Sequence, residues 1–208
     1  EYSHLQKIKD SAIILIQFDK ISKIIQSSTV TTNNIESAYE LTERLIKSGR
    51  RKIAHLRGGY ISQVSIDRFI GYQRALEKNE IEFDKNLVMI SEKRSFEEVV
   101  SKIQEMIDKG IDFDAVLAVD DKTAMGTIKC LLTNKIKIPE QVAVVGFSNA
   151  AYSKYLTPSL SSMDQSTDLF GTEIIRLFLE EKKMKKSSLD YNFSHVKIPT
   201  HFIKRESF

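Results

Sequence analysis

The chain has 208 residues, of which 41% are hydrophobic, and its 31 basic and 28 acidic side chains give a net charge of +3. This hydrophobic content is enough to fill a core, so the composition excludes a disordered chain. The longest apolar runs, AIILI and VAVV, are far shorter than the roughly 20 residues of a membrane helix, which excludes a membrane protein. The charges are scattered along the chain and form no nucleic-acid footprint.

Short apolar runs alternate with amphipathic segments along most of the chain. We predict strands over 12–18, 28–32, 52–57, 86–90, 114–119 and 142–147, and helices over 34–48, 63–79, 96–109 and 121–134. Runs such as VLAV and VAVV lack polar alternation, which is typical of strands covered on both faces. Strands separated by helices imply parallel sheets with right-handed crossovers, so the predicted class is α/β.

The alternation of strands and helices ends after Val145. A long loop containing Pro158 leads to a helix predicted over 168–181, and the tail holds only strands with Pro199 between them. A proline in that place is tolerated where a strand crosses between sheets. The basic cluster KKMKK, 182–186, is predicted to follow the last helix and to stabilise its C-terminus, in preference to binding phosphate.

The single cysteine, Cys130, lies on the apolar face of the predicted helix 121–134. One cysteine cannot form an internal disulfide, so we predict a buried, reduced thiol and a reducing, cytoplasmic location.

Several motifs together resemble one family, the lac repressor (LacI/GalR) family of transcription regulators. They are FDK (18–20), RLIKSGRRKIAHL (44–56), DRFIGYQRALEKN (67–79), VDDKTAMG (119–126), IPEQVAVVGFSN with LTPSLSSMDQ (138–149 and 156–165) and the ending IPTHFIKRES. They occur in the family's order and span nearly the whole chain.

The resemblance implies a periplasmic-binding-protein-like fold of type I, with two doubly wound parallel-sheet subdomains and a ligand cleft between them. The first subdomain would hold 1–31 and 166–197, and the second 32–165 and 198–208, with three chain crossings near 31–33, 165–167 and 197–199. In the family, a helix-turn-helix domain and the first βαβα units precede the FDK strand. These 208 residues do not include them, so the first subdomain is expected to be incomplete and operator DNA to be bound through a domain outside this chain.

Arg68 stands where the family's effector-clamping arginine stands. From the residues alone, an arginine one turn into a helix could instead form a surface ion pair with Asp67 or Glu77. Asp120 and Asp121 are both plausible N-caps of the helix that follows. We assign the cap to Asp121 and a ligand contact to Asp120.

Further residues come from the family pattern. Phe18 and Asp19 match a strand end after which Lys20 leans into the cleft, although a lone aromatic residue there is often part of a core. Thr32 matches a hinge position that is often aspartate, and Gln165 matches a hinge glutamine near the ligand.

Ser148 departs from the family pattern. Relatives that bind sugars or purines commonly carry aspartate here, whereas this chain reads GFSN. A serine cannot clamp two hydroxyl groups or balance the charge of Arg68. With Lys20 and Arg68 both candidates for the cleft, we expect an anionic sugar or sugar phosphate.

The sequence offers no catalytic set, and no cofactor or metal is expected. The four histidines, His4, His55, His195 and His201, have no spacing typical of a triad or a metal site. RGGY, 57–60, is predicted to be a tight turn. We therefore predict a non-enzymatic, homodimeric, effector-binding domain of a transcription regulator, with the helices 63–79 or 96–109 as candidate dimer contacts. The alternative is a periplasmic sugar-binding protein of a transporter.

Overall fold

The computed structural model describes residues 7–8, 11, 13–22, 24–59, 62–93, 95–186 and 192–208. The chain divides into two compact units, which we call the smaller unit (Glu1–Asn33 and Ser166–Pro199) and the larger unit (Asn34–Gln165 and Thr200–Phe208). Among the described residues, no helix has the length and apolar character needed to cross a membrane.

The larger unit is built on a six-stranded sheet in the order β4-β3-β5-β6-β7-β9. Every neighbouring pair is parallel except β7 and β9, which are antiparallel. The strands are β3 (Ile53–Gly58), β4 (Val88–Ser91), β5 (Ala115–Ala118), β6 (Ala143–Phe147), β7 (Ser161–Asp164) and β9 (His201–Ile203).

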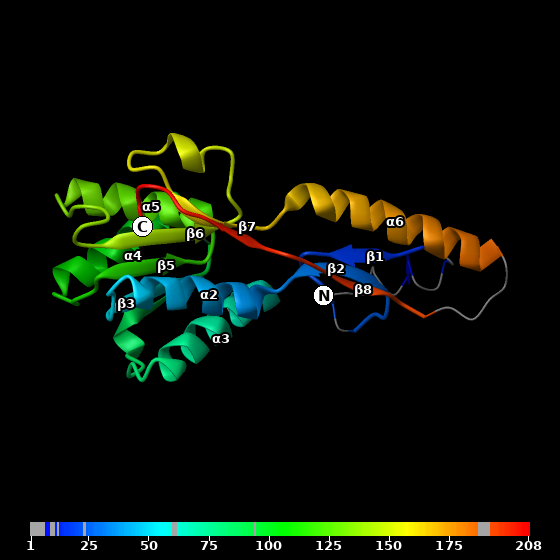
Figure 1. Ribbon diagram of the computed structural model, residues 1–208, viewed down its shortest axis with the longest axis horizontal. Helices are drawn as coiled ribbons and strands as arrows, with labels where there is room; N and C mark the ends of the chain where they lie inside the picture. The colour runs from blue at the N-terminus through cyan, green and yellow to red at the C-terminus, as the bar shows by residue number, and fades with distance from the viewer. Residues whose placement is uncertain are drawn as a thin grey trace. The chain divides into compact units, whose positions relative to one another are not determined.

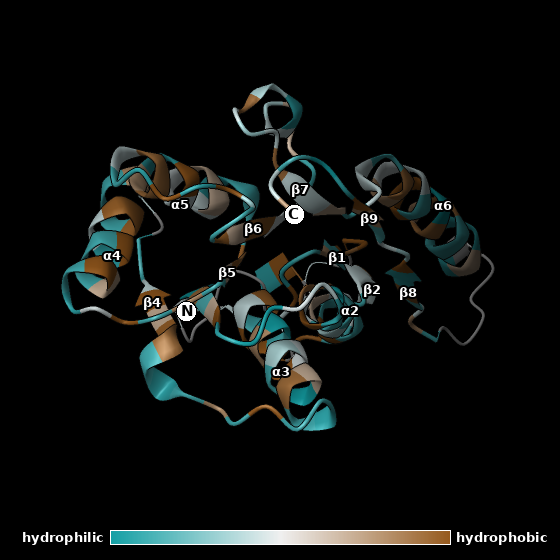
Figure 2. Cartoon of the chain, turned by 60° about the vertical axis from the view of Figure 1, so that its left-hand side comes forward, coloured by the Kyte–Doolittle hydropathy of each residue, from teal (hydrophilic) through white to brown (hydrophobic). Residues whose placement is uncertain are grey.

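Helices cover both faces of this sheet (Figure 1). They are α2 (Asn34–Lys47), α3 (Gln63–Lys78), α4 (Phe96–Asp108) and α5 (Asp121–Thr133). Alternate residues of one strand enter different cores: Val116 packs with α4 and α5, and Leu117 packs with α2 and α3. Figure 2 shows α4 and α5 with both hydrophobic and hydrophilic stretches, as expected of helices with one buried face. The prediction of strands covered on both faces is confirmed for the central strands.

Local chemistry explains where these helices begin and end. The Oγ of Ser95 accepts a hydrogen bond from the amide of Glu98 at 3.1 Å, which caps α4. Gly49 follows α2 with φ of 100°, a conformation that costs glycine little, and the amide of Arg50 then donates to the carbonyl of Leu45 at 3.1 Å.

The smaller unit has a parallel sheet in the order β1-β2-β8 and one long helix, α6. Its elements are β1 (Ile16–Phe18), β2 (Ser28–Thr32), β8 (His195–Ile198) and α6 (Thr167–Lys186). Val30 and Ile198 pack against Leu177 of α6. The predicted strand 12–18 is therefore too long, because only its last three residues pair with β2.

The basic cluster 182–186 also differs from its prediction. It lies within α6, which continues to Lys186, and does not follow the helix. Positive charge in the last turns of a helix is favourable, so the physical reason given for the cluster still applies.

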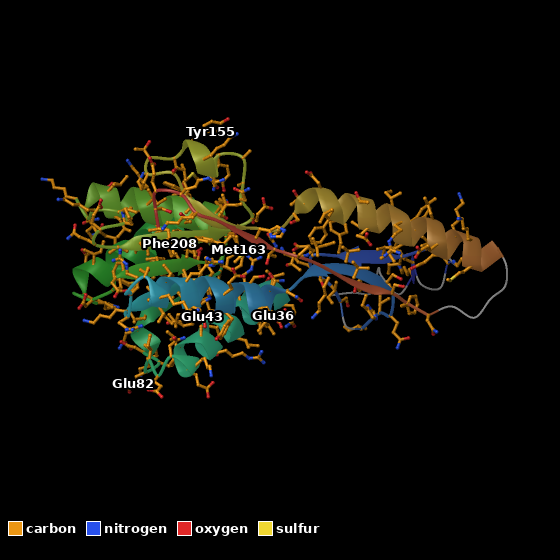
Figure 3. All side chains as sticks on the ribbon, viewed as in Figure 1. Glu36, Glu43, Glu82, Tyr155, Met163 and Phe208 are labelled. Carbon is orange, nitrogen blue, oxygen red and sulfur yellow. The ribbon has the colours of Figure 1, made fainter. Side chains whose placement is uncertain are left out.

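The tail joins β8 to β9 through Pro199 and Thr200, as the predicted arrangement of strands around Pro199 requires. After β9, the hydroxyl of Ser207 donates to the carbonyl of Val144 at 2.6 Å and accepts from the amide of Ser161 at 2.8 Å. These bonds fix the last residues between β6 and β7. Phe208 lies over the larger unit, and Tyr155 projects from the loop after β6 (Figure 3).

Cys130 is buried, as predicted, and its burial raises the pKa of the thiol.

Candidate functional site

The candidate residues of the larger unit gather at the carboxyl ends of its parallel strands. Asp120 follows β5 by two residues, Ser148 follows β6 directly, and Gln165 follows β7 directly. Open α/β sheets bind their ligands at this edge, because the loops there connect strands to helices and leave polar groups exposed.

Arg68 reaches this edge from the second turn of α3. Its Nε donates to Oδ1 of Asn34 at 3.0 Å, and its guanidinium also donates to the carbonyl of Val119. The guanidinium carbon lies 4.0 Å from the ring centroid of Phe147, a cation–π contact. The side chain is buried, with 3% exposure, so the alternative of a surface ion pair with Asp67 or Glu77 is wrong.

The two aspartates after β5 have the reverse of their predicted capping roles. Asp120 is the N-cap of α5, and its Oδ1 accepts from the amide of Thr123 at 2.8 Å. Asp121 is the first helical residue and is only 1% exposed. A ligand contact by Asp120, which is partly exposed, stays a prediction.

The carboxylate of Asp121 accepts three hydrogen bonds. Its Oδ2 accepts from the amide of Ala150 and the hydroxyl of Ser153, both at 2.7 Å, and its Oδ1 accepts from the hydroxyl of Ser162 at 2.6 Å. Burial raises the pKa of this carboxyl group, and the three hydrogen bonds oppose that rise.

Ser148 contacts Gln165. Its Oγ donates to Oε1 of Gln165 at 3.1 Å, and its amide donates to the carbonyl of Met163 at 2.9 Å. The structure thus brings together two residues that lie 17 positions apart and that the sequence motifs single out separately.

The remaining candidates belong to the smaller unit. Phe18 ends β1 with 55% of its side chain exposed, so the alternative that it is a core residue is wrong. Asp19, the first residue after β1, has φ of 57°, and Lys20, the second, is exposed. Thr32 ends β2 and is buried, with 7% exposure. Ligand contacts by these four residues stay predictions.

Sequence reasoning missed two contributors. Neither Asn34 nor Phe147 is among the predicted site residues, yet both contact the guanidinium of Arg68. The asparagine pair at 33–34 is compatible with a helix start, but it does not indicate a contact with Arg68. Phe147 carried no signal of its own.

Two surface hollows lined by described residues lie away from this edge. One, of about 720 Å³, is lined by residues such as Lys52 and Phe83, and another, of about 790 Å³, runs along α4 beside Val100 and Gln104. The described part of the chain holds no group of three or more histidine, cysteine, aspartate or glutamate residues that could bind a metal ion. The prediction of a tight turn at RGGY is wrong for its first two residues, because Arg57 and Gly58 belong to β3 and pair with β4. Tyr60 lies outside the described residues.

Comparison of the sequence with models of known protein families identifies the family of this chain. The family model described as periplasmic binding protein-like domain matches residues 42–208. The chain belongs to this family. The predicted fold class is thereby confirmed, and the predicted resemblance to the lac repressor family is confirmed by the relatives, which are LacI-type transcriptional regulators.

Two relatives illustrate the match. The transcriptional regulator CelR of Thermobifida fusca is 32% identical over 155 residues, which cover 74% of this chain and 45% of CelR. The regulator MalR of Clostridium butyricum is 28% identical over 208 aligned residues, covering 94% of this chain and 57% of MalR. This member of the periplasmic binding protein-like family therefore spans about half the length of its regulator relatives.

Solved structures of transcriptional regulators are also similar to this chain. The complex of the regulator CelR with cellobiose has a TM-score of 0.88 at 27% identity, over 98% of this chain and 62% of that one. A LacI-family sugar-binding transcriptional regulator from Escherichia coli, complexed with phosphate, has a TM-score of 0.79 at 25% identity, over 100% of this chain and 73% of that one.

Proposed function

We propose that these residues form the effector-binding part of a LacI-type transcriptional regulator and that a small sugar-like molecule binds at the carboxyl ends of the parallel strands. The observation that carries the proposal is the arrangement of Arg68 over Phe147 beside the Ser148–Gln165 pair, in a chain whose relatives are ligand-responsive regulators. The relatives favour a regulator over a transporter's binding protein.

The chemistry suits a polyol. Guanidinium, carboxylate and amide groups are planar and bidentate, so each can bond two neighbouring hydroxyl groups of a ring. We assign this role to Arg68, Asp120 and Gln165 in the larger unit. In the smaller unit, we propose Asp19, Lys20 and Thr32 as candidate polar contacts of an effector and Phe18 as a candidate aromatic contact.

We further propose that the effector carries negative charge. Position 148 is a neutral serine that hydrogen-bonds Gln165, whereas sugar-binding relatives are expected to place a carboxylate there. Arg68 supplies positive charge to the part of the proposed site that lies in the larger unit. An acidic sugar or a sugar phosphate would form charge-assisted hydrogen bonds with its guanidinium.

A binding screen tests the proposal. We expect glucose 6-phosphate or gluconate to raise the melting temperature of the protein more than cellobiose, glucose or hypoxanthine does. Arg68→Met should weaken binding of the best ligand by about 10- to 100-fold, because one or two charge-assisted hydrogen bonds are lost. Arg74→Met is the matched control, since Arg74 is exposed on the same helix. Unchanged affinity in folded Arg68→Met would contradict the assignment, and the absence of binding by all compounds would contradict the proposed ligand class.

Ser148→Asp tests the charge of the effector separately. An added carboxylate should weaken glucose 6-phosphate binding at least about tenfold and strengthen cellobiose binding, because aspartate repels the phosphate and accepts from two hydroxyl groups. Aspartate tolerates a positive φ better than most residues, so the φ of 109° at this position is compatible with the change. Ser148→Ala is the control that removes the hydroxyl without adding charge. Equal effects of both variants on the two ligands, measured by titration calorimetry, would contradict an anionic effector.

The activity of the whole protein is part of the same proposal. Effector binding would alter operator affinity only if it favours one of two conformations of the regulator. We propose that the intact protein is cytoplasmic, forms a homodimer, binds operator DNA through residues outside this chain and catalyses no reaction. Sedimentation of the chain with and without effector tests the dimer.

A further inference from the structure

The turn after β6 has an unusual backbone. Ser148 has φ of 109° and Asn149 has φ of 48°, so two successive residues other than glycine adopt the left-handed region. Such conformations are unfavourable for residues with a Cβ and persist only where surrounding contacts hold them. Ser148 is also a residue of the proposed effector site, so whatever holds this turn also determines where its hydroxyl points.

The buried carboxylate of Asp121 holds the turn from one side. The amide of Asn149 donates to the Oγ of Ser162 at 3.0 Å, and that hydroxyl donates to Asp121 Oδ1 at 2.6 Å. The next amide, that of Ala150, donates directly to Asp121 Oδ2 at 2.7 Å. The carboxylate therefore binds the amide of Ala150 directly and the amide of Asn149 through the hydroxyl of Ser162.

The side chain of Asn149 holds the turn from the other side. Its Nδ2 donates to Oδ2 of Asp164 at 2.8 Å, and its Oδ1 accepts from the guanidinium of Arg205. Arg205 is fixed in turn by a bond from its guanidinium to the carbonyl of Leu160 at 2.6 Å. The tail and β7 therefore restrain the same turn.

Two observations show that the carboxylate of Asp121 does more than cap a helix. The N-terminus of α5 is already capped by Asp120, so the carboxylate of Asp121 is not needed for that purpose. The neighbouring strand leaves room for the carboxylate through Gly146, where an added Cβ would lie 2.3 Å from Asp121 Oδ1.

We infer that Asp121 is a positioning residue of the effector site: it holds the turn 148–150 in the one conformation that directs Ser148 toward Gln165. The carboxylate of Asp121 restrains the backbone of this turn whether or not a ligand is bound. Its effect on ligand affinity rests on the proposed function.

The first test uses the ligand-free protein. In Asp121→Asn and in Ser162→Ala, hydrogen exchange at the amides of Asn149 and Ala150 should become at least about tenfold faster, because their acceptors are lost or weakened. Asp114→Asn is the matched control: its carboxylate accepts from the amides of Arg51 and Lys52 at the opposite end of β5. That variant should leave exchange at Asn149 and Ala150 unchanged. Retained protection of both amides in both test variants would overturn the inference.

The second test measures binding of glucose 6-phosphate and cellobiose. For whichever probe binds the parent protein, Ser162→Ala should weaken binding by about tenfold. This loss of affinity should disappear when Ser148 is already alanine, because Ser162 affects the ligand only through the hydroxyl of Ser148. A merely structural role would give the same loss in both backgrounds and would overturn the positioning role. If none of the screened sugars binds the parent protein, the proposed ligand class is contradicted, and the exchange experiment alone decides the inference.

Discussion

Replacing Gly71 with alanine is expected to lower the free energy of unfolding by about 2–3 kcal/mol. A Cβ at this position in α3 would lie 2.2 Å from the carbonyl oxygen of Ile35 and 2.8 Å from the amide nitrogen of Tyr39. Both atoms belong to the backbone of α2, so no change of side-chain rotamer relieves the overlap. The two helices must move apart, which loosens the core they share around Leu41 and Tyr72.

Gly171→Ala is the matched control for this prediction. Gly171 also lies within a helix, α6, and an added Cβ would meet nothing within 4 Å. Alanine is the better helix former, so this variant should be more stable by about 0.5–1 kcal/mol. Urea unfolding followed by circular dichroism gives both values. A Gly71→Ala protein as stable as the parent would show that α2 and α3 are not packed as described.

The regular elements of this chain could be predicted because their patterns are local. Ile35, Leu41 and Leu45 recur at helical spacing, and α2 begins at the predicted residue and ends within one residue of its predicted end. β1 was predicted too long because apolar residues show only that a segment can be buried. The length of a strand depends on its partner, and β2 pairs with only three of these residues.

The site was less predictable, because its details depend on distant residues. Asp120 and Asp121 are equally good caps from local sequence. The acceptors and donors that decide between them include Ala150 and Ser162, which lie 29 and 41 residues from Asp121. The family motifs singled out Arg68, Ser148 and Gln165, but no pattern could show that Asn34 and Phe147 hold the guanidinium.

His55 should make the stability of the protein depend on pH below about 6.5. The imidazole is fully buried in β3, and its Nδ1 donates to the carbonyl of Leu117 at 2.9 Å. It stacks against Tyr72 and Phe69, with ring centroids 5.1 and 5.9 Å away, and Nε2 has no hydrogen-bond partner among the described residues. A proton on Nε2 would therefore create a buried donor without an acceptor.

Burial lowers the pKa of His55 from 6.5 to about 4, and the positive charges of Arg57 and Arg68 contribute to the lowering. In the unfolded chain the imidazole binds a proton near pH 6.5, whereas in the folded protein it stays neutral until about pH 4. The unfolded state thus binds more protons between these values. The stability contribution is fully present above pH 6.5, falls as the pH decreases, and amounts to roughly 3 kcal/mol lost by pH 4.

His55→Asn isolates this contribution, because asparagine keeps a donor for the carbonyl of Leu117 and has no proton to bind in this range. We expect the variant to be less stable at pH 8, since a smaller side chain leaves a cavity, but to lose roughly 3 kcal/mol less than the parent between pH 7 and 4. His201→Asn, at an exposed position in β9, should keep the parent's pH dependence. Urea unfolding at several pH values measures all three proteins. Parallel curves for the parent and His55→Asn would mean that carboxylates alone account for the acid sensitivity, and that the buried imidazole is accommodated equally well in its charged form.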